Sequence, residues 1–514
     1  MRSTFMGLET SKRGLYTQQS ALYTTGHNIG NANTPGYSRQ RVNMQATSGF
    51  PGVGLNAGTV PGFLGTGVEA GSIQRIRDSF VDHQFRSEST KLGYWESRTN
   101  AIAQMEDAIG EPSEYGLQQS MSDFWQSLQT LATSPENGGA RAVVVERGVA
   151  VADSFNYIHK SVSEIKGNLG DQIDFSTNDI NSLLTQIGEL NKQIANVEPN
   201  GYLPNDLYDT RDGLLDKLSS YVPIETSYEK SGGRALAIAE GTVTIKIKTT
   251  TTAAITVVKG GESSKISINT SGTGKFPDAI DDFHISGKPA VNDPDKVIAL
   301  EIDNMPKTGE LRSLVDSYGY NTPSGVKGLY PEMMAKLDEM ANAFAKAFNT
   351  VHEGGTDLKG DKGVPFFVNA DSEGKFTAST IAVDDAFRKD PNKLAASTST
   401  TGAEVGNGQN AKNLGDVFFD KEVGLDGSSV QGFYAQVIGQ LGVEGQQAIK
   451  MTESSGVLLL AVSNRRDSIS SVSLDEEMTD MIRFQQAYNA SARMITVMDE
   501  ALDKIINGMG TVGR

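Results

Sequence analysis

A seam of apolar side chains, spaced alternately four and three residues apart, constrains this 514-residue chain more than any other feature. Eight of its nine positions are apolar. The seam consists of Leu169, Ile173, Ser176, Ile180, Leu183, Ile187, Leu190, Ile194 and Val197. Such a repeat over about four heptads predicts a coiled-coil helix. At ~1.5 Å per residue the helix forms a rod of about 40 Å, so we expect an elongated molecule.

The hydrophobic period changes to two between residues 224 and 323. Val243, Ile245 and Ile247 alternate with threonine and lysine, and the alternation returns at Ile298 and Leu300. Threonine-rich alternation broken by glycine-rich turns predicts a small antiparallel β domain. Helical patterns flank it on both sides. We therefore predict an elongated, multi-domain α+β chain, with α-helical coiled-coil terminal domains and an inserted antiparallel β domain.

These patterns divide the chain into five segments. We expect one domain from 1–90 with 466–514, a helical coiled-coil domain from 91–223 with 324–465, and the β domain from 224–323. Because two domains take sequence from both halves of the chain, we expect one elongated molecule with its termini brought together. The tail from about Val430 is predicted as two helices broken between Thr452 and Gly456.

The composition argues against several kinds of function. The formal charge of −17 disfavours nucleic acid as a partner, because phosphates attract excess lysine and arginine, and it disfavours an anionic membrane surface. The chain has no cysteine to serve as a thiolate ligand or nucleophile, and its five histidines lack the spacing of a helical metal pair. We predict no catalytic, cofactor or metal site, and no nucleic-acid or membrane partner.

The N-terminal segment carries a narrow apolar stripe followed by a corner. The stripe repeats every seven residues and consists of Leu8, Leu15, Leu22 and Ile29. Mostly polar residues separate its members, so it suits one partner helix. In the corner, Thr34 is extended because it precedes a proline, and Pro35-Gly36 suits a type II turn.

The C-terminal segment carries a wider stripe, in which eight of ten seam positions between residues 474 and 506 are apolar. Burial of one such stripe offsets only part of the entropy lost when the segment is ordered, so a lone helix frays without a partner. We predict that the terminal helices pair with each other and with neighbouring subunits. The alternative is ordinary core packing within one domain.

Three stretches resemble signatures of the axial proteins of the bacterial flagellum. The N-terminal signature of rod, hook and first hook-associated proteins is similar to residues 20–40, which include Asn28-Ile29-Gly30-Asn31-Ala32-Asn33-Thr34-Pro35-Gly36-Tyr37. The C-terminal signature of hook-associated and flagellin-like proteins is similar to 473–493, and a motif of the adjoining helical domain to 205–212. Gly30, where the family usually has alanine, and Tyr208, where leucine is commoner, depart from the pattern. This combination is expected only in the family of flagellar hook-associated protein 1.

The resemblance implies a structural protein that joins the hook to the filament and is needed for filament assembly. It implies self-association in a ring, contacts with the hook protein and the third hook-associated protein, and an export chaperone at the C-terminal region. It also implies an extracellular location in the flagellum, reached through the flagellar type III apparatus without a cleaved signal peptide. The segments 1–90 and 466–514 would be the two parts of a flagellin-like axial core domain. The motifs further imply nested layers, with the helical domain next and the β domain at the far tip.

Subunit packing is the role that we predict for residues of both ends, from the apolar stripes for the stripe residues and from the resemblance for the motif residues. The candidates are Leu8, Leu15, Leu22, Asn28, Ile29, Asn31, Asn33, Pro35, Gly36, Tyr37, Met478, Gln485, Tyr488, Arg493, Ile495 and Leu502. A purely intramolecular role for the same residues stays open. The sequence is also compatible with a different axial protein (hook or flagellin-like), with a secreted coiled-coil adhesin, and with an enzyme that carries a hydrolytic site in the β domain.

Overall fold

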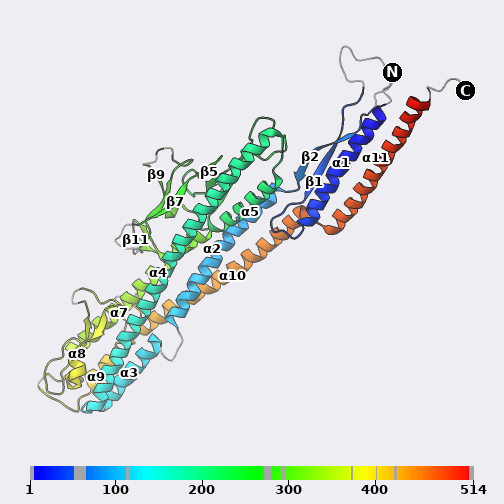
Figure 1. Ribbon diagram of the computed structural model, residues 1–514. Helices are drawn as coiled ribbons and strands as arrows, with labels where there is room; N and C mark the ends of the chain where they lie inside the picture. The colour runs from blue at the N-terminus through cyan, green and yellow to red at the C-terminus, as the bar shows by residue number, and fades with distance from the viewer. Residues whose placement is uncertain are drawn as a thin grey trace.

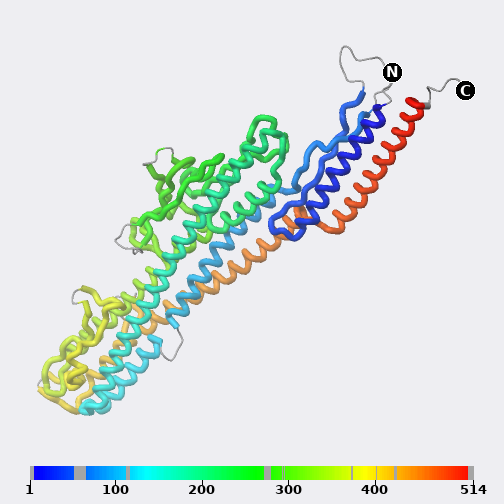
Figure 2. Tube along the Cα trace, viewed as in Figure 1, coloured from blue at the N-terminus to red at the C-terminus, as the bar shows by residue number. Residues whose placement is uncertain are grey.

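The computed structural model describes residues 5–50, 65–110, 116–270, 279–291, 293, 296–371, 374–400, 402–421, 425 and 427–508. The protein is an elongated rod with both termini at one end (Figure 1). Figure 2 shows the chain leaving this end and returning to it, so that its blue and red segments lie beside each other. Within the described ranges, no helix combines the length and apolar character needed to cross a membrane.

Among the described residues, two helices and a hairpin form the end that holds the termini. These elements are α1 (Met6–Gly30), β1 (Gln40–Ala46), β2 (Val68–Arg75) and α11 (Leu474–Gly508). The strands pair antiparallel, with a bulge between Asn43 and Met44. Both α11 and the hairpin contact α1, so the first helix lies between them.

The body of the rod is a bundle of helices from both halves of the chain. Its helices are α2 (Ser79–Ile109), α4 (Gly138–Val197), α5 (Asn205–Tyr221), α6 (Glu310–Tyr318), α7 (Leu329–Glu353) and α10 (Val430–Ser470), with one 3₁₀ turn at Glu198–Asn200. This arrangement, together with several small antiparallel sheets, confirms the predicted fold class.

The predicted break in the C-terminal tail was wrong. Helix α10 continues through Thr452–Gly456, and the chain turns at residues 471–473. Helix α10 packs along α2, and the Thr452 hydroxyl lies 3.0 Å from that of Thr99. This packing outweighs the cost of about 1 kcal/mol of a glycine inside a helix.

The predicted coiled-coil seam lies on α4, which begins at Gly138 and is therefore longer than the seam. The Asn137 side chain caps it by accepting hydrogen bonds from the N–H groups of Gly139 and Ala140. All seam positions are buried except Leu190 and Val197, which are half-buried. The seam faces several short elements, since α4 contacts α5, α6 and strands of two sheets.

The segment predicted as a β domain forms two antiparallel sheets. One has the order β3-β4-β5-β6 and the other β7-β8-β9. The strands are β3 (Ile224–Glu229), β4 (Thr242–Ile247), β5 (Ile255–Lys259), β6 (Glu262–Ser263), β7 (Lys265–Asn269), β8 (Asp282–Ser286) and β9 (Val297–Glu301), followed by a 3₁₀ turn at Ile302–Asn304 and the hairpin β10 (Tyr320–Thr322) with β11 (Gly325–Lys327). Both sheets pack on α4, because Asn191 and Asn181 hydrogen-bond the backbone of Val243 and Ile266.

The expectation that the β domain forms the far tip was wrong. Figure 1 shows it beside the middle of the rod, and other elements build the end opposite the termini. These are α3 (Leu117–Thr133), β12 (Phe367–Asn369), β13 (Ile381–Val383), α8 (Asp385–Lys389), a 3₁₀ turn (Pro391–Lys393) and α9 (Gln409–Asp416), with the ends of α4 and α7. A cluster of buried phenylalanines fills this end, and its members are Phe124, Phe344, Phe348, Phe366, Phe367 and Phe418.

His352 lies at the edge of this cluster with no exposed surface. Its Nδ1–H donates to the Val364 carbonyl at 2.6 Å, and its Nε2 accepts from the Ala395 N–H at 2.9 Å. One neutral tautomer satisfies both bonds. Burial lowers the pKa of His352 from 6.5 to about 4.

We predict that the free energy of unfolding falls between about pH 6.5 and pH 4. The unfolded His352 takes up a proton near pH 6.5 and the folded one only near pH 4, so protonation favours unfolding in this window. At ~1.4 kcal/mol per pKa unit the loss is on the order of 3 kcal/mol. Urea titrations of wild type and His352→Gln over this range isolate the effect, and equal pH slopes for the two proteins would contradict it.

Candidate assembly interface

Helices α1 and α11 pack antiparallel through small residues. Gly7 faces Met498, Gly14 faces Ser491 and Asn28 contacts Glu477, so the contact advances in steps of seven residues in opposite directions along the two helices. A Cβ on Gly14 would lie 3.2 Å from the Ser491 Oγ. The two backbones approach closely because Gly7, Gly14 and Ala21 carry little or no side chain.

The hairpin covers another side of α1. The Thr17 hydroxyl lies 3.2 Å from the Val68 carbonyl, and the Thr10 hydroxyl lies 3.4 Å from the Thr66 carbonyl. Thr17, Ala21, Thr24 and Thr25 are buried along α1. The inner surface of this helix is therefore made of small and hydroxylated residues.

Each residue of the predicted N-terminal stripe follows by one position a residue of α1 that lies on the side facing α11. All four of its members, Leu8, Leu15, Leu22 and Ile29, are half-buried. Among the C-terminal candidates, Tyr488, Ile495 and Leu502 are half-buried, whereas Met478, Gln485 and Arg493 are exposed. The two helices do pack against each other. The sequence feature that would have identified the contact is the seven-residue repeat of the small residues Gly7, Gly14 and Ala21 beside the stripe.

The corner after α1 is built around Asn28, which is 1% exposed. Its Nδ2 donates to the Gln40 carbonyl at 2.8 Å and to Glu477 at 3.0 Å. Its Oδ1 accepts from the Gln40 N–H at 3.0 Å and from the Tyr37 hydroxyl at 2.8 Å. Every hydrogen-bonding position of this amide is used, so it fixes how α1, β1 and α11 meet.

Tyr37 connects Asn28 to His27, whose Nδ1 lies 2.9 Å from the Tyr37 hydroxyl. Burial raises the pKa of Tyr37, and the carboxylates of Asp206, Asp209 and Glu477 raise it further. The hydroxyl therefore stays protonated and can donate.

The remaining corner candidates lie nearer the surface. Asn33, Pro35 and Gly36 are exposed, whereas the half-buried Asn31 donates from its side chain to the His27 carbonyl at 3.0 Å. Gly36 has φ +79°, as position i+2 of a type II turn requires.

Arg39 joins the corner to the start of α11. Its Nε lies 2.6 Å from Glu477 and its Nη1 2.5 Å from Glu476. Its backbone N–H donates to the Ser470 carbonyl at 2.8 Å. One residue thus holds the turn between α10 and α11 against the corner.

A buried ion cluster joins the terminal end to the body. Arg75, from β2, contacts Asp209 at 2.7 Å and Asp212 at 2.6 Å, and both carboxylates lie on α5. Asp212 also contacts Arg77 at 3.3 Å and Arg86 at 3.2 Å. Burial alone would raise the pKa of Asp212, but the arginines around it lower the pKa below its usual range.

Two of the recognised sequence motifs meet at this cluster. The Ser38 hydroxyl and N–H donate to Asp209 at 2.7 and 3.1 Å, and the Gln40 Nε2 donates to Asp206 at 3.2 Å. The motif at 205–212 therefore binds the corner through the carboxylates of Asp206 and Asp209. The sequence does not predict the roles of Arg75, Arg77 and Arg86, because their partners on α5 lie more than a hundred residues away in the chain.

No group of three or more potential metal-binding side chains occurs within the described ranges.

We predict that Gly14→Cys with Ser491→Cys forms an intramolecular disulfide. The Cβ of residue 14 would lie 4.0 Å from that of Ser491, inside the range of natural disulfides, and the chain has no cysteine of its own. Faster migration on a non-reducing gel reports the bond. Gly26→Cys with Ser491→Cys is the control, because nothing lies within 4 Å of a Cβ at Gly26. Equal yields from the two pairs would rule out this register.

We also predict that Arg75→Ala lowers the free energy of unfolding by about 3–5 kcal/mol, since it leaves buried carboxylates without a partner. Arg41→Ala, on the same hairpin and exposed, should change it by less than about 0.5 kcal/mol. Denaturant titrations of both variants measure the difference in the free energy of unfolding. Equal values for the two variants would contradict the prediction and show that Arg77 and Arg86 alone compensate the buried carboxylates.

Comparison with known proteins places the chain in a family. The model described as "Flagellar hook-associated protein FlgK helical domain" matches residues 102–367. The models for the flagellar basal body rod FlgEFG protein C-terminal region and the flagella basal body rod protein match 466–508 and 8–37.

Full-length relatives agree with these matches. Flagellar hook-associated protein 1 of Bacillus subtilis (strain 168) is 44% identical over 520 residues, covering 100% of both chains. That of Escherichia coli (strain K12) is 24% identical over 97% of this chain and 99% of its own. The solved flagellar hook junction protein FlgK from Burkholderia pseudomallei has a TM-score of 0.60 at 13% identity, covers 76% of this chain and 100% of its own, and supports the fold alone. The chain belongs to the family of flagellar hook-associated protein 1.

Proposed function

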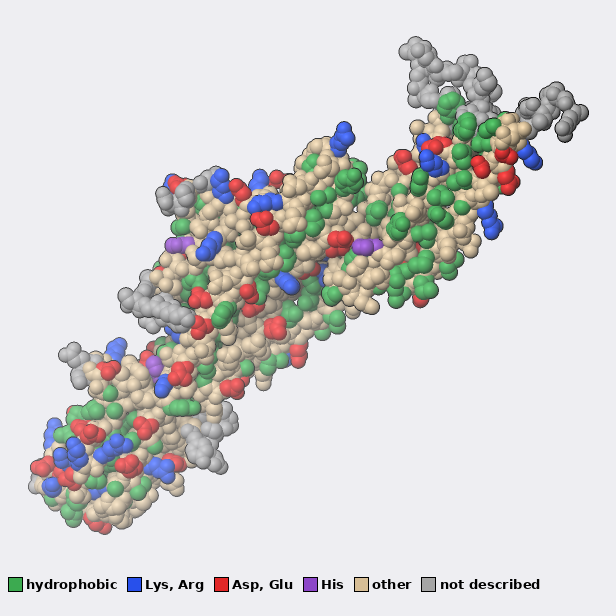
Figure 3. All heavy atoms as spheres, viewed as in Figure 1, with side chains coloured by type: hydrophobic (Ala, Val, Ile, Leu, Met, Phe, Trp, Pro, Cys, Tyr) green, Lys and Arg blue, Asp and Glu red, His purple; other side chains and the backbone are tan. Residues whose placement is uncertain are grey.

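We propose that this chain is a structural, non-enzymatic component of the bacterial flagellum that joins the hook to the filament and is needed for filament assembly. The observation that carries the proposal is a family-typical pair of terminal helices that leaves large apolar side chains exposed. Figure 3 shows hydrophobic side chains gathered over this end of the molecule.

The exposed apolar side chains lie on both helices of the pair. They are Tyr16 and Tyr23 on α1, with Phe5 just before it, and Leu474, Met478, Ile482, Met494, Val497, Ile505 and Ile506 on α11. The described part of this end, two helices and a hairpin, forms too thin a layer to bury side chains on every face. Large exposed apolar surface is typical of interaction sites, which favours completion of this layer by neighbouring subunits.

The same surface supports the partners that the family implies. We propose a ring of copies of this chain, bounded by the hook protein on one side and the third hook-associated protein on the other. Before assembly, an export chaperone would cover the apolar faces of α11. The assembled location would be extracellular, after export without a cleaved signal peptide.

Subunit packing remains our proposal for the predicted candidates of both ends. Exposed residues such as Asn33, Pro35, Met478 and Gln485 are available to neighbours. Asn28 is fully engaged within its own chain, so its contribution would be indirect, through the orientation of the corner.

We predict that Tyr23→Ser impairs retention of the filament while leaving the monomer folded. Tyr23 is 71% exposed, so its loss removes apolar contact with neighbours and little from the fold. Tyr157→Ser is the control, because Tyr157 is a 68% exposed tyrosine on α4, away from the termini. The measurement is the amount of flagellin shed into the medium by a deletion strain that carries each variant.

The deletion strain itself tests the junction role. It should build hooks and release unpolymerised flagellin, and wild-type chain should restore filaments. Normal filaments in the strain would refute the junction role. Binding of the purified chain to a host surface, without any affinity for hooks, would favour the adhesin alternative.

A further inference from the structure

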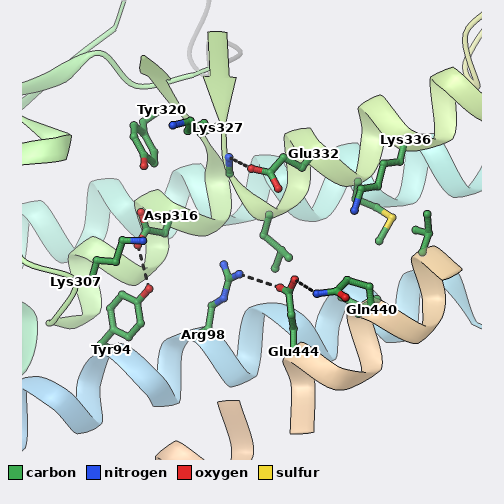
Figure 4. Close-up of a pocket in the computed structure, with 15 residues that line it drawn as sticks. Tyr94, Arg98, Lys307, Asp316, Tyr320, Lys327, Glu332, Lys336, Gln440 and Glu444 are labelled. Carbon is green, nitrogen blue, oxygen red and sulfur yellow. Dashed lines mark hydrogen bonds and ion pairs between the residues drawn. The ribbon is translucent and has the colours of Figure 1, made fainter. Parts of the chain in front are cut away.

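A basic pocket of about 310 Å³ lies on the body of the rod, where α2, α6, α7, α10 and the β10–β11 hairpin meet (Figure 4). Four cationic side chains from different segments line it, namely Arg98, Lys307, Lys327 and Lys336. Its lining also includes the apolar side chains of Met333, Val437 and Leu441. We call this site the lysine pocket.

The carboxylates of the lysine pocket already have other partners. Asp316 accepts from Tyr94 at 3.1 Å and pairs with Arg312 at 3.0 Å. Glu444 pairs with Arg98 at 3.3 Å. Glu332 accepts from the Gly328 N–H at 3.3 Å.

The lysines lack such partners. Among the described residues, no carboxylate oxygen lies within ion-pair distance of Lys307, Lys327 or Lys336. Three ammonium groups therefore line the pocket without an ion pair, beside the carboxylate of Glu332, although the whole chain carries a formal charge of −17.

An acidic face on α4 has the complementary charge. The exposed or half-buried positions Glu146, Asp153, Glu164, Asp171 and Glu189 differ by 7, 11 or 18 residues, spacings that return to one side of a helix within about 20°. Two carboxylates of this face have an exposed partner on the same helix, since Lys160 lies 4.0 Å from Glu164 and Lys192 lies 2.7 Å from Glu189. Exposed pairs of this kind contribute little.

The centre of the acidic face lies at the height of the lysine pocket along the rod. The Lys166 amine stands 5.1 Å from the centre of the Tyr318 ring, and Tyr320 lines the pocket two residues later. Glu164 and Asp171 flank Lys166 on α4. In Figure 4, α4 runs behind α6 and α7 as seen from the pocket. Glu164 lies two residues, about 200° of helix turn, from the buried Val162, so it points away from the packed side of α4.

We propose that the lysine pocket receives Glu164 and Asp171 of a second copy of this chain. Two different surfaces, on opposite sides of one subunit and at one height, give a head-to-tail contact of the kind that closes rings. Copies that each carry −17 repel one another, and local pairing of opposite charges offsets that repulsion and sets the register. The proposal rests on the ring proposed above and identifies one of its lateral contacts.

Cysteine cross-linking in assembled flagella tests this contact. The full-length chain carrying Lys336→Cys and Glu164→Cys is expressed in a strain without its own copy, and mild oxidation is followed by a non-reducing gel. The contact predicts a ladder of disulfide-linked multimers, with no background because the chain has no cysteine. The control, Lys412→Cys with Glu164→Cys, places the thiol on exposed α9 at the far end and should give no ladder.

Charge reversal supplies a second readout. Lys327→Glu with Lys336→Glu should reduce cross-linking by about tenfold or more, since like charges across a contact cost several kcal/mol. For this arm the cysteines replace Leu329, which lines the pocket, and the exposed Asn168, which lies between Glu164 and Asp171 on α4. Adding Glu164→Lys and Asp171→Lys should restore the ladder, whereas Lys393→Glu with Lys412→Glu, reversed on the far end, should leave it unchanged.

The outcomes separate this contact from the junction role. Filaments that form normally without any ladder would overturn the contact and leave the junction role standing. Binding of free phosphate or citrate to the pocket, with assembly unaffected by Glu164→Lys, would equally overturn it in favour of a small-anion site. Loss of filaments in the wild-type complemented strain would instead overturn the junction role.

Discussion

The contact of Asp212 with three arginines is the interaction on which the architecture of this protein depends. Arg75, Arg77 and Arg86 approach one buried carboxylate from β2, the following segment and α2. Within the described ranges, the terminal helices share no apolar core with the body comparable to the phenylalanine cluster at the far end. Their orientation relative to the rod therefore relies on directional ion pairs and hydrogen bonds, whose geometry tolerates less variation than apolar packing.

The spacing of apolar residues predicted much of the fold, because the side of a helix or strand that is buried must be apolar. The α4 seam, the alternating strands and the presence of a helix at each end all follow from where apolar residues recur. The same reasoning failed at Gly456, because packing between α10 and α2 outweighs local propensity. It also misplaced the β domain, since a pattern within a segment carries no information about which part of a neighbouring helix the segment covers.

The candidate site was harder to predict, for physical reasons that particular residues illustrate. An apolar stripe includes Leu15 but not Gly14, because glycine contributes no apolar side chain. It is nevertheless the absence of a side chain at Gly14 that permits the close approach of α11. Likewise, Arg75 and Asp212 look like ordinary surface charges in the sequence. Only the fold brings them together and removes them from water, and it is burial that makes such a pair consequential.

The Asn28 amide uses all of its hydrogen-bonding positions, so its hydrolysis to aspartate would change the corner. Aspartate has nearly the same shape, yet it offers two acceptors and no donor when ionised. At position 28 it would lose the bonds to the Gln40 carbonyl and to Glu477, and it would place two carboxylates against each other. Hydrolysis of this single amide group would therefore convert an attractive contact between α1, β1 and α11 into a repulsive one.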